Sequence, residues 1–284
     1  YTIFEHLGGN TEEQQWANYR ITETPSKGVM MWGNMNGEYG KLSKGYSGNI
    51  SGMTSSSRGF TANRLIGYPE SHDEERLMYY NKNAGNSTNT SHNVKTLSVG
   101  LSRISAIGAV SLLIPGPKMI WHFGELGWDS SIYTCTDGTV NDNSATIAGD
   151  CKLSTKPQPQ WVNNWLSDNS RNKIYNDWAR MIDLKTTEAV FSGTATMVNS
   201  SNLTPNIKIT NSSLASTALK DVLIIANFDV TAKNVATGFQ YTGSWYNLMD
   251  NSPYTVTDAS ATINLQPGEF RIYGNKSTVL ATTD

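Results

Sequence analysis

The sequence has 284 residues, of which 38% are hydrophobic and 16% are charged, and its formal net charge at pH 7 is -2. These values are typical of a globular protein and exclude a disordered or fibrous chain. Lysine and arginine number 22 and aspartate and glutamate 24, and no basic tract occurs, so a nucleic-acid partner is not expected.

No transmembrane segment is expected, because the longest apolar stretch, Ile104 to Ile114, is interrupted by small and polar residues. It is far shorter than the roughly 20 residues that a membrane-spanning helix needs. The chain opens on Tyr1 to Phe4, which has the pattern of a strand and not of a signal peptide. We therefore expect the natural polypeptide to begin before Tyr1.

Short apolar strands alternate with helices in the first part of the chain. The predicted strands cover residues 1–4, 29–32, 64–68 and 118–123. One helix is expected from Thr11, with Gln14 completing a capping box, one long helix over 94–110, and another from Ser170. Residues 34–57 are rich in glycine, serine and asparagine and predict a loop. Strands that alternate with helices in this way indicate a parallel sheet.

The pattern changes beyond about residue 185. Short strands are predicted at 222–226, 243–248, 261–265 and 269–273, separated by turn residues. Such spacing indicates an antiparallel β-sandwich of about ninety residues.

The two cysteines, Cys135 and Cys151, flank a polar segment and have no CxxC spacing. A disulfide that closes this loop is favoured over a zinc site, which needs four ligands, and over two unrelated buried thiols. A disulfide, together with the low charged fraction, places the protein outside the cytoplasm, in the periplasm, on the cell surface or secreted.

The densest polar cluster, residues 68–76, directly follows the third predicted strand and contains His72 and Asp73. An acid-rich helix N-terminus explains the acids equally well, but it needs no histidine. Glu5 and Glu125 also follow predicted strands. Carboxylates gathered at the carboxyl ends of parallel strands suit general acid and base catalysis on an acetal.

Four aromatic residues lie near the same strand ends and could stack on sugar rings: Trp32, Tyr80, Trp121 and Trp128. For any one of them, packing in the core is the more frequent role.

Several strings together resemble the α-amylase family of glycoside hydrolases, in the order that the family has them. GYPESHDEERLMYYN is similar to the motif after its seventh barrel strand, IPGPKMIWHFGELGWD to its eighth strand, and YTIFEHLGGNTEEQQWANY to its fifth. SSRGFTANRL, KPQPQW, NFDV, GSWYNLMD and LQPGEFRIYG extend the resemblance to nearly the whole chain. The resemblance is nearest to amylases of Bacteroidetes-type bacteria.

The resemblance implies a fold and domain boundaries. Residues 1–184 would be the C-terminal half, strands 5–8, of a TIM (β/α)8 barrel, residues 185–276 an all-β antiparallel sandwich, and residues 277–284 a tail. A complete barrel takes about 250 residues, which the first segment does not reach.

The resemblance also implies roles for individual residues. Glu5 would be the catalytic acid and base, Asp73 the carboxylate that holds and distorts the sugar, and His72 a hydrogen-bond donor to the same ring. Trp32, Tyr80, Glu125 and Trp128 would bind substrate or shape the pocket. Ser71 stands where the family more often has asparagine.

The family's nucleophile, an aspartate two residues after an arginine on the fourth strand, has no counterpart, since only four residues precede Glu5. The expected protein is therefore the C-terminal part of a retaining α-glucan hydrolase, inactive alone, with the N-terminal half of the same enzyme as its partner. Calcium, if bound, would depend on that half, and no other metal or cofactor is expected. The alternatives are a related α-glucosidase or transglycosylase and a non-catalytic glucan-binding protein.

Overall fold

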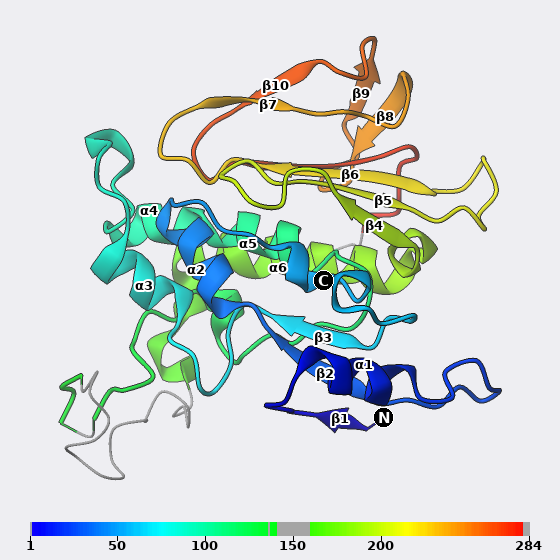
Figure 1. Ribbon diagram of the computed structural model, residues 1–284. Helices are drawn as coiled ribbons and strands as arrows, with labels where there is room; N and C mark the ends of the chain where they lie inside the picture. Colours follow the sequence, from blue (N-terminus) through cyan, green and yellow to red (C-terminus); the bar gives the residue numbers. More distant parts are fainter. Residues whose placement is uncertain (1, 136, 141–159, 281–284) are drawn as a thin grey trace.

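The computed structural model describes residues 2–135, 137–140 and 160–280 (Figure 1). The α-helices are α1 (Asn10–Asn18), α2 (Asn36–Lys44), α3 (Leu77–Ala84), α4 (Leu97–Ser102), α5 (Ile104–Ser111) and α6 (Asn169–Thr187). The strands are β1 (Ile3–Phe4), β2 (Met30–Asn34), β3 (Leu65–Tyr68), β4 (Thr194–Met197), β5 (Asn206–Thr210), β6 (Asp221–Ala226), β7 (Lys233–Ala236), β8 (Gly243–Asn247), β9 (Pro253–Val256), β10 (Thr262–Leu265) and β11 (Phe270–Gly274).

A parallel sheet forms the N-terminal part, in the order β1-β2-β3. This confirms the first three predicted strands. The predicted strand over 118–123 is wrong, because only Lys118 joins the sheet, through one parallel bridge to Gly67. Phe123 has a left-handed φ of 61°, so the chain leaves an extended path at the end of this segment.

The helices also differ from the sequence prediction in three places. Residues 34–57 are not a loop, since they contain α2, which buries Tyr39 and Leu42. The single helix expected over 94–110 is two helices, α4 and α5, that meet at the buried residue Arg103. At α6 the side chain of Asp168, and not that of Ser170, caps the helix by accepting hydrogen bonds from two backbone N–H groups.

Helix α1 begins at Asn10, and its N-cap residue Gly9 makes no side-chain hydrogen bond, so the predicted capping box does not form. Residues 185–187 still belong to α6, so the predicted domain boundary after residue 184 falls within the last turn of that helix. The division into domains is otherwise untested and stays a prediction.

Antiparallel strands form the C-terminal part, in a six-stranded sheet of order β4-β5-β6-β11-β8-β9 and a two-stranded sheet of β10 and β7. The predicted strands correspond to β6, β8, β10 and β11. Strands β4, β5, β7 and β9 were not predicted. Figure 1 shows the two-stranded sheet above the larger sheet, then a layer of helices, and the parallel strands below.

Strand β6 is buried along its whole length because both of its faces are covered. Val222 and Ile224 point into a core with Ile107 of α5, whereas Leu223 and Ile225 point into a second core between the two antiparallel sheets. The larger core therefore joins the helical layer to the six-stranded sheet.

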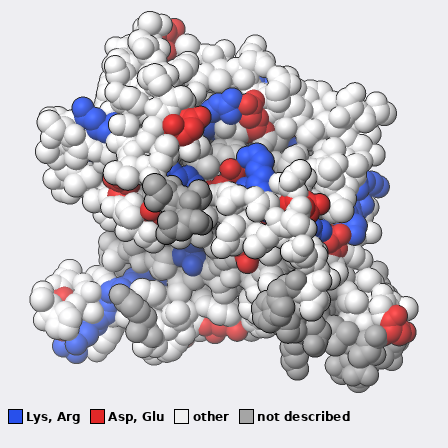
Figure 2. All heavy atoms as spheres, turned by 180° about the vertical axis from the view of Figure 1, so that it is seen from behind, with Lys and Arg blue, Asp and Glu red and all other residues white. Residues whose placement is uncertain are grey.

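On the face shown in Figure 2, acidic and basic side chains are scattered and most of the visible surface is uncharged. In the described part of the chain, no helix combines the length and the apolar character needed to cross a bilayer. The predicted disulfide involves Cys151, which lies outside the described residues, so this pairing stays a prediction.

Candidate active site

Three predicted site residues converge at one edge of the parallel sheet. One carboxylate oxygen of Glu5, one ring nitrogen of His72 and one carboxylate oxygen of Asp73 lie within 4.8 Å of one another. His72 Nε2 is 3.3 Å from Asp73 Oδ2. Glu5 and Asp73 are exposed and His72 is half-buried, so the group is open to a ligand from solvent.

The topology explains why residues 67 positions apart in the chain meet. Glu5 directly follows β1, and the loop that carries His72 and Asp73 follows β3. Both strands are parallel to β2, so their carboxyl ends lie at the same edge of the sheet. This is the edge at which parallel α/β folds place their active sites.

Aromatic rings flank His72 on two sides. The centroid of the Trp32 ring lies 5.8 Å from that of His72, and the centroid of the Trp121 ring lies 6.0 Å from it. Tyr68 makes an edge contact with Trp32, at a centroid distance of 5.6 Å. Flat apolar faces beside hydrogen-bonding groups are the surfaces on which sugar rings can stack.

Tyr68 stays protonated in this setting. Burial is the main cause that raises its pKa well above the ordinary value, and the negative charges of Glu74 and Glu5 raise it further. A neutral phenol next to the carboxylates remains available as a hydrogen-bond donor.

Side-chain hydrogen bonds within the loop of residues 69–76 stabilise its conformation. Ser71 is buried, its hydroxyl contacts the Glu74 carboxylate, and it accepts the Asp73 backbone N–H at 3.3 Å. Glu74 also accepts a hydrogen bond from the side chain of Asn34, at the end of β2. Ser71, where the family more often has asparagine, therefore orders the segment that contains Asp73.

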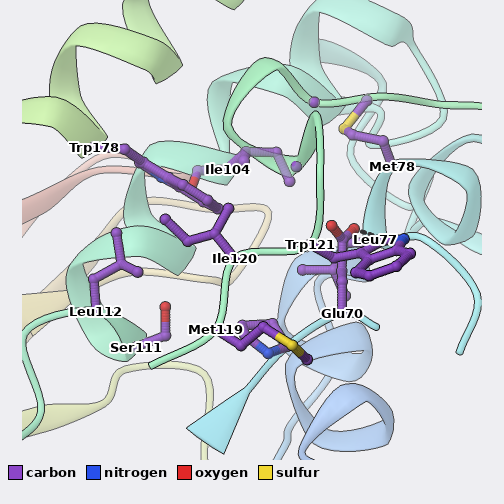
Figure 3. Close-up of a pocket in the computed structure, with 13 residues that line it drawn as sticks. Glu70, Leu77, Met78, Ile104, Ser111, Leu112, Met119, Ile120, Trp121 and Trp178 are labelled. Carbon is purple, nitrogen blue, oxygen red and sulfur yellow. Dashed lines mark hydrogen bonds between the residues drawn. The ribbon is translucent and has the colours of Figure 1, made fainter. Parts of the chain in front are cut away.

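Glu70 lies at the base of the same loop, beside Leu77 and Trp121 (Figure 3). Its Oε1 accepts the Leu77 N–H at 2.6 Å, and burial raises the pKa of its carboxyl. The apolar cavity that it lines has a volume of about 20 Å³. This is room for about one water molecule and excludes a sugar.

Three other predicted site residues do not belong to the cluster of Glu5, His72 and Asp73. Tyr80 packs on α2, with the Lys44 ammonium 4.9 Å from its ring centroid. Trp128 is buried under the Arg76 guanidinium, at 4.2 Å. Glu125 lies in a 3-10 turn (Gly124–Leu126), and burial raises the pKa of its carboxyl. Their positions favour structural roles, and a role in binding substrate stays untested.

Asn34 was not predicted at the site, whereas Tyr68 and Ser71 were predicted only as members of the polar cluster of residues 68–76. Their proximity to the carboxylates follows from the register of β2 and β3, in which Asn34 pairs with Tyr68. A sequence signal existed for Tyr68 and Ser71, because both belong to the polar cluster that follows the strand, whereas none existed for Asn34.

Histidine and carboxylate ligands at this separation can also share a divalent cation. Among the described residues, Glu5, His72 and Asp73 are the one group of this kind. Exposed carboxylates often gather without an ion, and nothing further in this group indicates one.

Fold and site together define an α/β unit with a carboxylate and histidine cluster at its strand ends, followed by an antiparallel β-sandwich. Comparison with solved structures identifies the fold as that of the α-amylases. An AmyP variant in complex with maltotriose superimposes with a TM-score of 0.68 at 10% identity, over 98% of this chain and 56% of that one. The α-amylase from H. orenii gives 0.58 at 12% identity, over 97% and 53%.

Pullulanase from Bacillus acidopullulyticus gives a TM-score of 0.54 at 16% identity, over 93% of this chain and 30% of that one. No family model and no curated protein matches the sequence. The chain thus spans slightly more than half the length of the amylases that it resembles. The predicted resemblance is confirmed for the fold, and a Bacteroidetes origin stays a prediction.

Proposed function

We propose that the chain is the C-terminal part of a retaining α-glucan hydrolase that cleaves α-1,4-glucosidic bonds in starch, glycogen or maltooligosaccharides. The observation that carries this proposal is the convergence of Glu5, His72 and Asp73 within 4.8 Å. The maltotriose and maltose in complexes of AmyP, which has the same fold, support a glucan as the ligand.

In the proposed reaction Glu5 donates its proton to the glycosidic oxygen as the bond to the anomeric carbon breaks. The nucleophile, an aspartate outside the 284 residues, takes the anomeric carbon and forms a glycosyl-enzyme. Glu5, now ionised, then removes a proton from the water that attacks this intermediate, which restores the acid.

Asp73 and His72 would act on the sugar and not on the leaving group. A carboxylate accepts hydrogen bonds from sugar hydroxyls, and its charge stabilises the oxocarbenium-like transition state. The His72 ring can donate a hydrogen bond to the same sugar, while Trp32 and Trp121 provide faces for stacking. The exposure of both carboxylates is consistent with a site that substrate covers.

The parallel strands β1 to β3 and the bridge at Lys118 would be strands 5–8 of a (β/α)8 barrel. Support comes from their order, in which each successive segment lies beside the last, as in a singly wound barrel. The partner of the chain would then be the N-terminal half of the same enzyme, which would also supply calcium ligands if calcium is bound. We place the enzyme outside the cytoplasm, with a Cys135–Cys151 disulfide.

The direct test compares the chain with the complete polypeptide in an assay for reducing ends released from starch. We expect the chain alone to be inactive, and activity to appear when it is mixed with the N-terminal half or made as one polypeptide. Hydrolysis by the chain alone would show that the nucleophile assignment is wrong. Binding of maltotriose by the complete polypeptide without hydrolysis would identify a glucan-binding protein.

A further inference from the structure

The side-chain amide of Asn36 is buried beneath the loop that carries His72 and Asp73. Asn36 is the first residue of α2, separated from the end of β2 by Met35, and is 3% exposed. Its Nδ2 atom donates two hydrogen bonds, each 2.8 Å long, to the backbone oxygens of Pro69 and Glu75.

Pro69 and Glu75 stand near the two ends of that loop, since β3 ends at Tyr68 and α3 begins at Leu77. One amide group therefore fixes the separation of the two ends, and His72 and Asp73 lie on the arc between them. A shift of the Asn36 amide would therefore move the ends of the loop, and with them the backbone of His72 and Asp73.

The turn from β2 into α2 is itself docked on β3. The backbone N–H of Met35 donates to the Tyr68 oxygen at 3.1 Å, and the N–H of Asn36 donates to Asn34 Oδ1 at 2.9 Å. The Asn34 side chain in turn donates to the Glu74 carboxylate. The turn thus touches the loop at its start, at its end and at Glu74.

We propose that Asn36 is a positioning residue that holds the loop of residues 69–76 in the conformation in which His72 and Asp73 act on substrate. This inference rests on the proposed function for its kinetic consequence. The geometric part stands without it, because the two hydrogen bonds and the burial do not depend on the reaction.

Residue chemistry explains why an asparagine suits this position. Two backbone oxygens out of contact with water need donors, and a primary amide supplies two N–H groups from one nitrogen without adding a charge. A serine can donate only one hydrogen bond, and an alanine none. A misplacement of catalytic groups by about 1 Å can lower the rate on the order of a hundredfold.

The sandwich contains a matched control in Asn227. It is 0% exposed, and its Nδ2 also donates to two backbone oxygens, those of Thr231 and Leu265, at 2.9 Å each. Asn36→Ala removes two donated hydrogen bonds, and Asn227→Ala removes two donated ones and the one that Asn227 Oδ1 accepts from the Asp229 N–H at 2.9 Å, so we expect the control to lower Tm at least as much. Only the first change touches the loop.

The experiment uses the complete enzyme and measures kcat and KM on maltoheptaose, together with hydrogen exchange of the loop amides. We expect Asn36→Ala to lower kcat about 10- to 100-fold with a change of less than about threefold in KM, because interactions specific to the transition state are lost. Asn227→Ala should leave both constants within about twofold of wild type. Amides of residues 69–76 should exchange faster in Asn36→Ala alone.

Equal kcat values for the two alanine variants would overturn the proposal. If Asn36→Ala does not fold, Asn36→Ser, which keeps one hydrogen-bond donor, replaces it. We expect Asn36→Ser to give a smaller fall in kcat. An unchanged kcat in this variant would also overturn the proposal. If the wild type hydrolyses no glucan, the proposed function is wrong. Hydrogen exchange of the loop amides then still tests whether Asn36 holds the loop in place. Faster exchange in the Asn36 variant would support that role, and unchanged exchange would refute it.

Discussion

His72 Nε2 lies 3.3 Å from Asp73 Oδ2, and both side chains lie beside Glu5, which comes from a different strand end. The arrangement concentrates hydrogen-bonding capacity for sugar hydroxyls next to a carboxyl group that can transfer a proton.

Removing the charge of either carboxylate should abolish most of the activity. In the complete enzyme we expect Glu5→Gln and Asp73→Asn each to lower kcat on maltoheptaose about 100- to 10,000-fold, because proton transfer or charge stabilisation is lost. The matched control is Glu12→Gln, an exposed carboxylate 3.5 Å from His6 and close to the same strand end. Rates near wild type in either active-site variant, or a loss as large in the control, would contradict the assignments.

Substitution of Trp32 and of Trp128 should separate a ligand-binding residue from a structural one. Trp32 is half-buried and faces His72, so Trp32→Ala should weaken binding of maltotriose about tenfold while lowering the free energy of unfolding little. Trp128 is buried against Arg76, so Trp128→Ala should lower the free energy of unfolding by about 3–5 kcal/mol.

Calorimetric titration and chemical denaturation measure these two effects separately. Trp32→Phe, which keeps an aromatic face, should restore part of the affinity. If Trp128→Ala weakens binding of maltotriose by the folded protein as much as Trp32→Ala does, the structural interpretation of Trp128 is wrong.

The carboxylate cluster was predictable because its signal is local. Glu5 follows directly after an apolar strand and Asp73 lies in the short loop after another, and parallel strands bring their carboxyl ends to one edge whatever lies between them. Glu125 follows the segment of residues 118–123, which joins the sheet only at Lys118, so the same argument fails there. Asn36 could not be found, because its role depends on contacts with residues more than thirty positions away.

The unpredicted elements share a physical cause. Helix α2 contains Gly37 and Gly40, which have low helix propensity, and burial of Tyr39 and Leu42 compensates for it. Strands β4 and β7 carry polar residues on exposed positions and so lack a long apolar run. In both cases tertiary contacts decide the structure, and a pattern of a few residues does not contain them.

Stability should rise with pH because of Lys185. Burial lowers the pKa of its ammonium group from 10.5 to about 7, while in the unfolded chain the pKa keeps its ordinary value. Between these two values the unfolded state binds more protons than the folded state, so the free energy of unfolding increases as pH rises. The contribution is lost again as pH falls toward 7.

Urea denaturation between about pH 7 and 10 measures this dependence. Lys185→Met should flatten the profile, since one such group contributes up to about 1.4 kcal/mol per pH unit. Lys173→Met, at a lysine whose side chain is 67% exposed, should leave the slope unchanged. Burial also lowers the pKa of Lys118, so the free energy of unfolding of the Lys185 variant should still rise somewhat with pH. Identical slopes in wild type and Lys185→Met would contradict the prediction.

Arg103 should be one of the most important residues for stability, since it links the helices to the sandwich. It is 0% exposed and lies where α4 ends and α5 begins. Its guanidinium donates to the backbone oxygens of Leu42 and Ser43 at the end of α2, and to that of Phe228 in the sandwich. Removing this group leaves buried oxygens without a donor, at about 1–3 kcal/mol each.

We expect Arg103→Leu to lower the free energy of unfolding by about 3–5 kcal/mol, measured by chemical denaturation. Arg20→Leu serves as the control, because that side chain is 52% exposed and its contacts with Glu23 and the Tyr19 ring lie on the surface, where an ion pair contributes little to stability. Because Arg103 contacts both parts of the molecule, its loss should also separate the unfolding of the sandwich from that of the helical part. A single transition within about 0.5 kcal/mol of wild type would show that the larger apolar core alone joins the two parts.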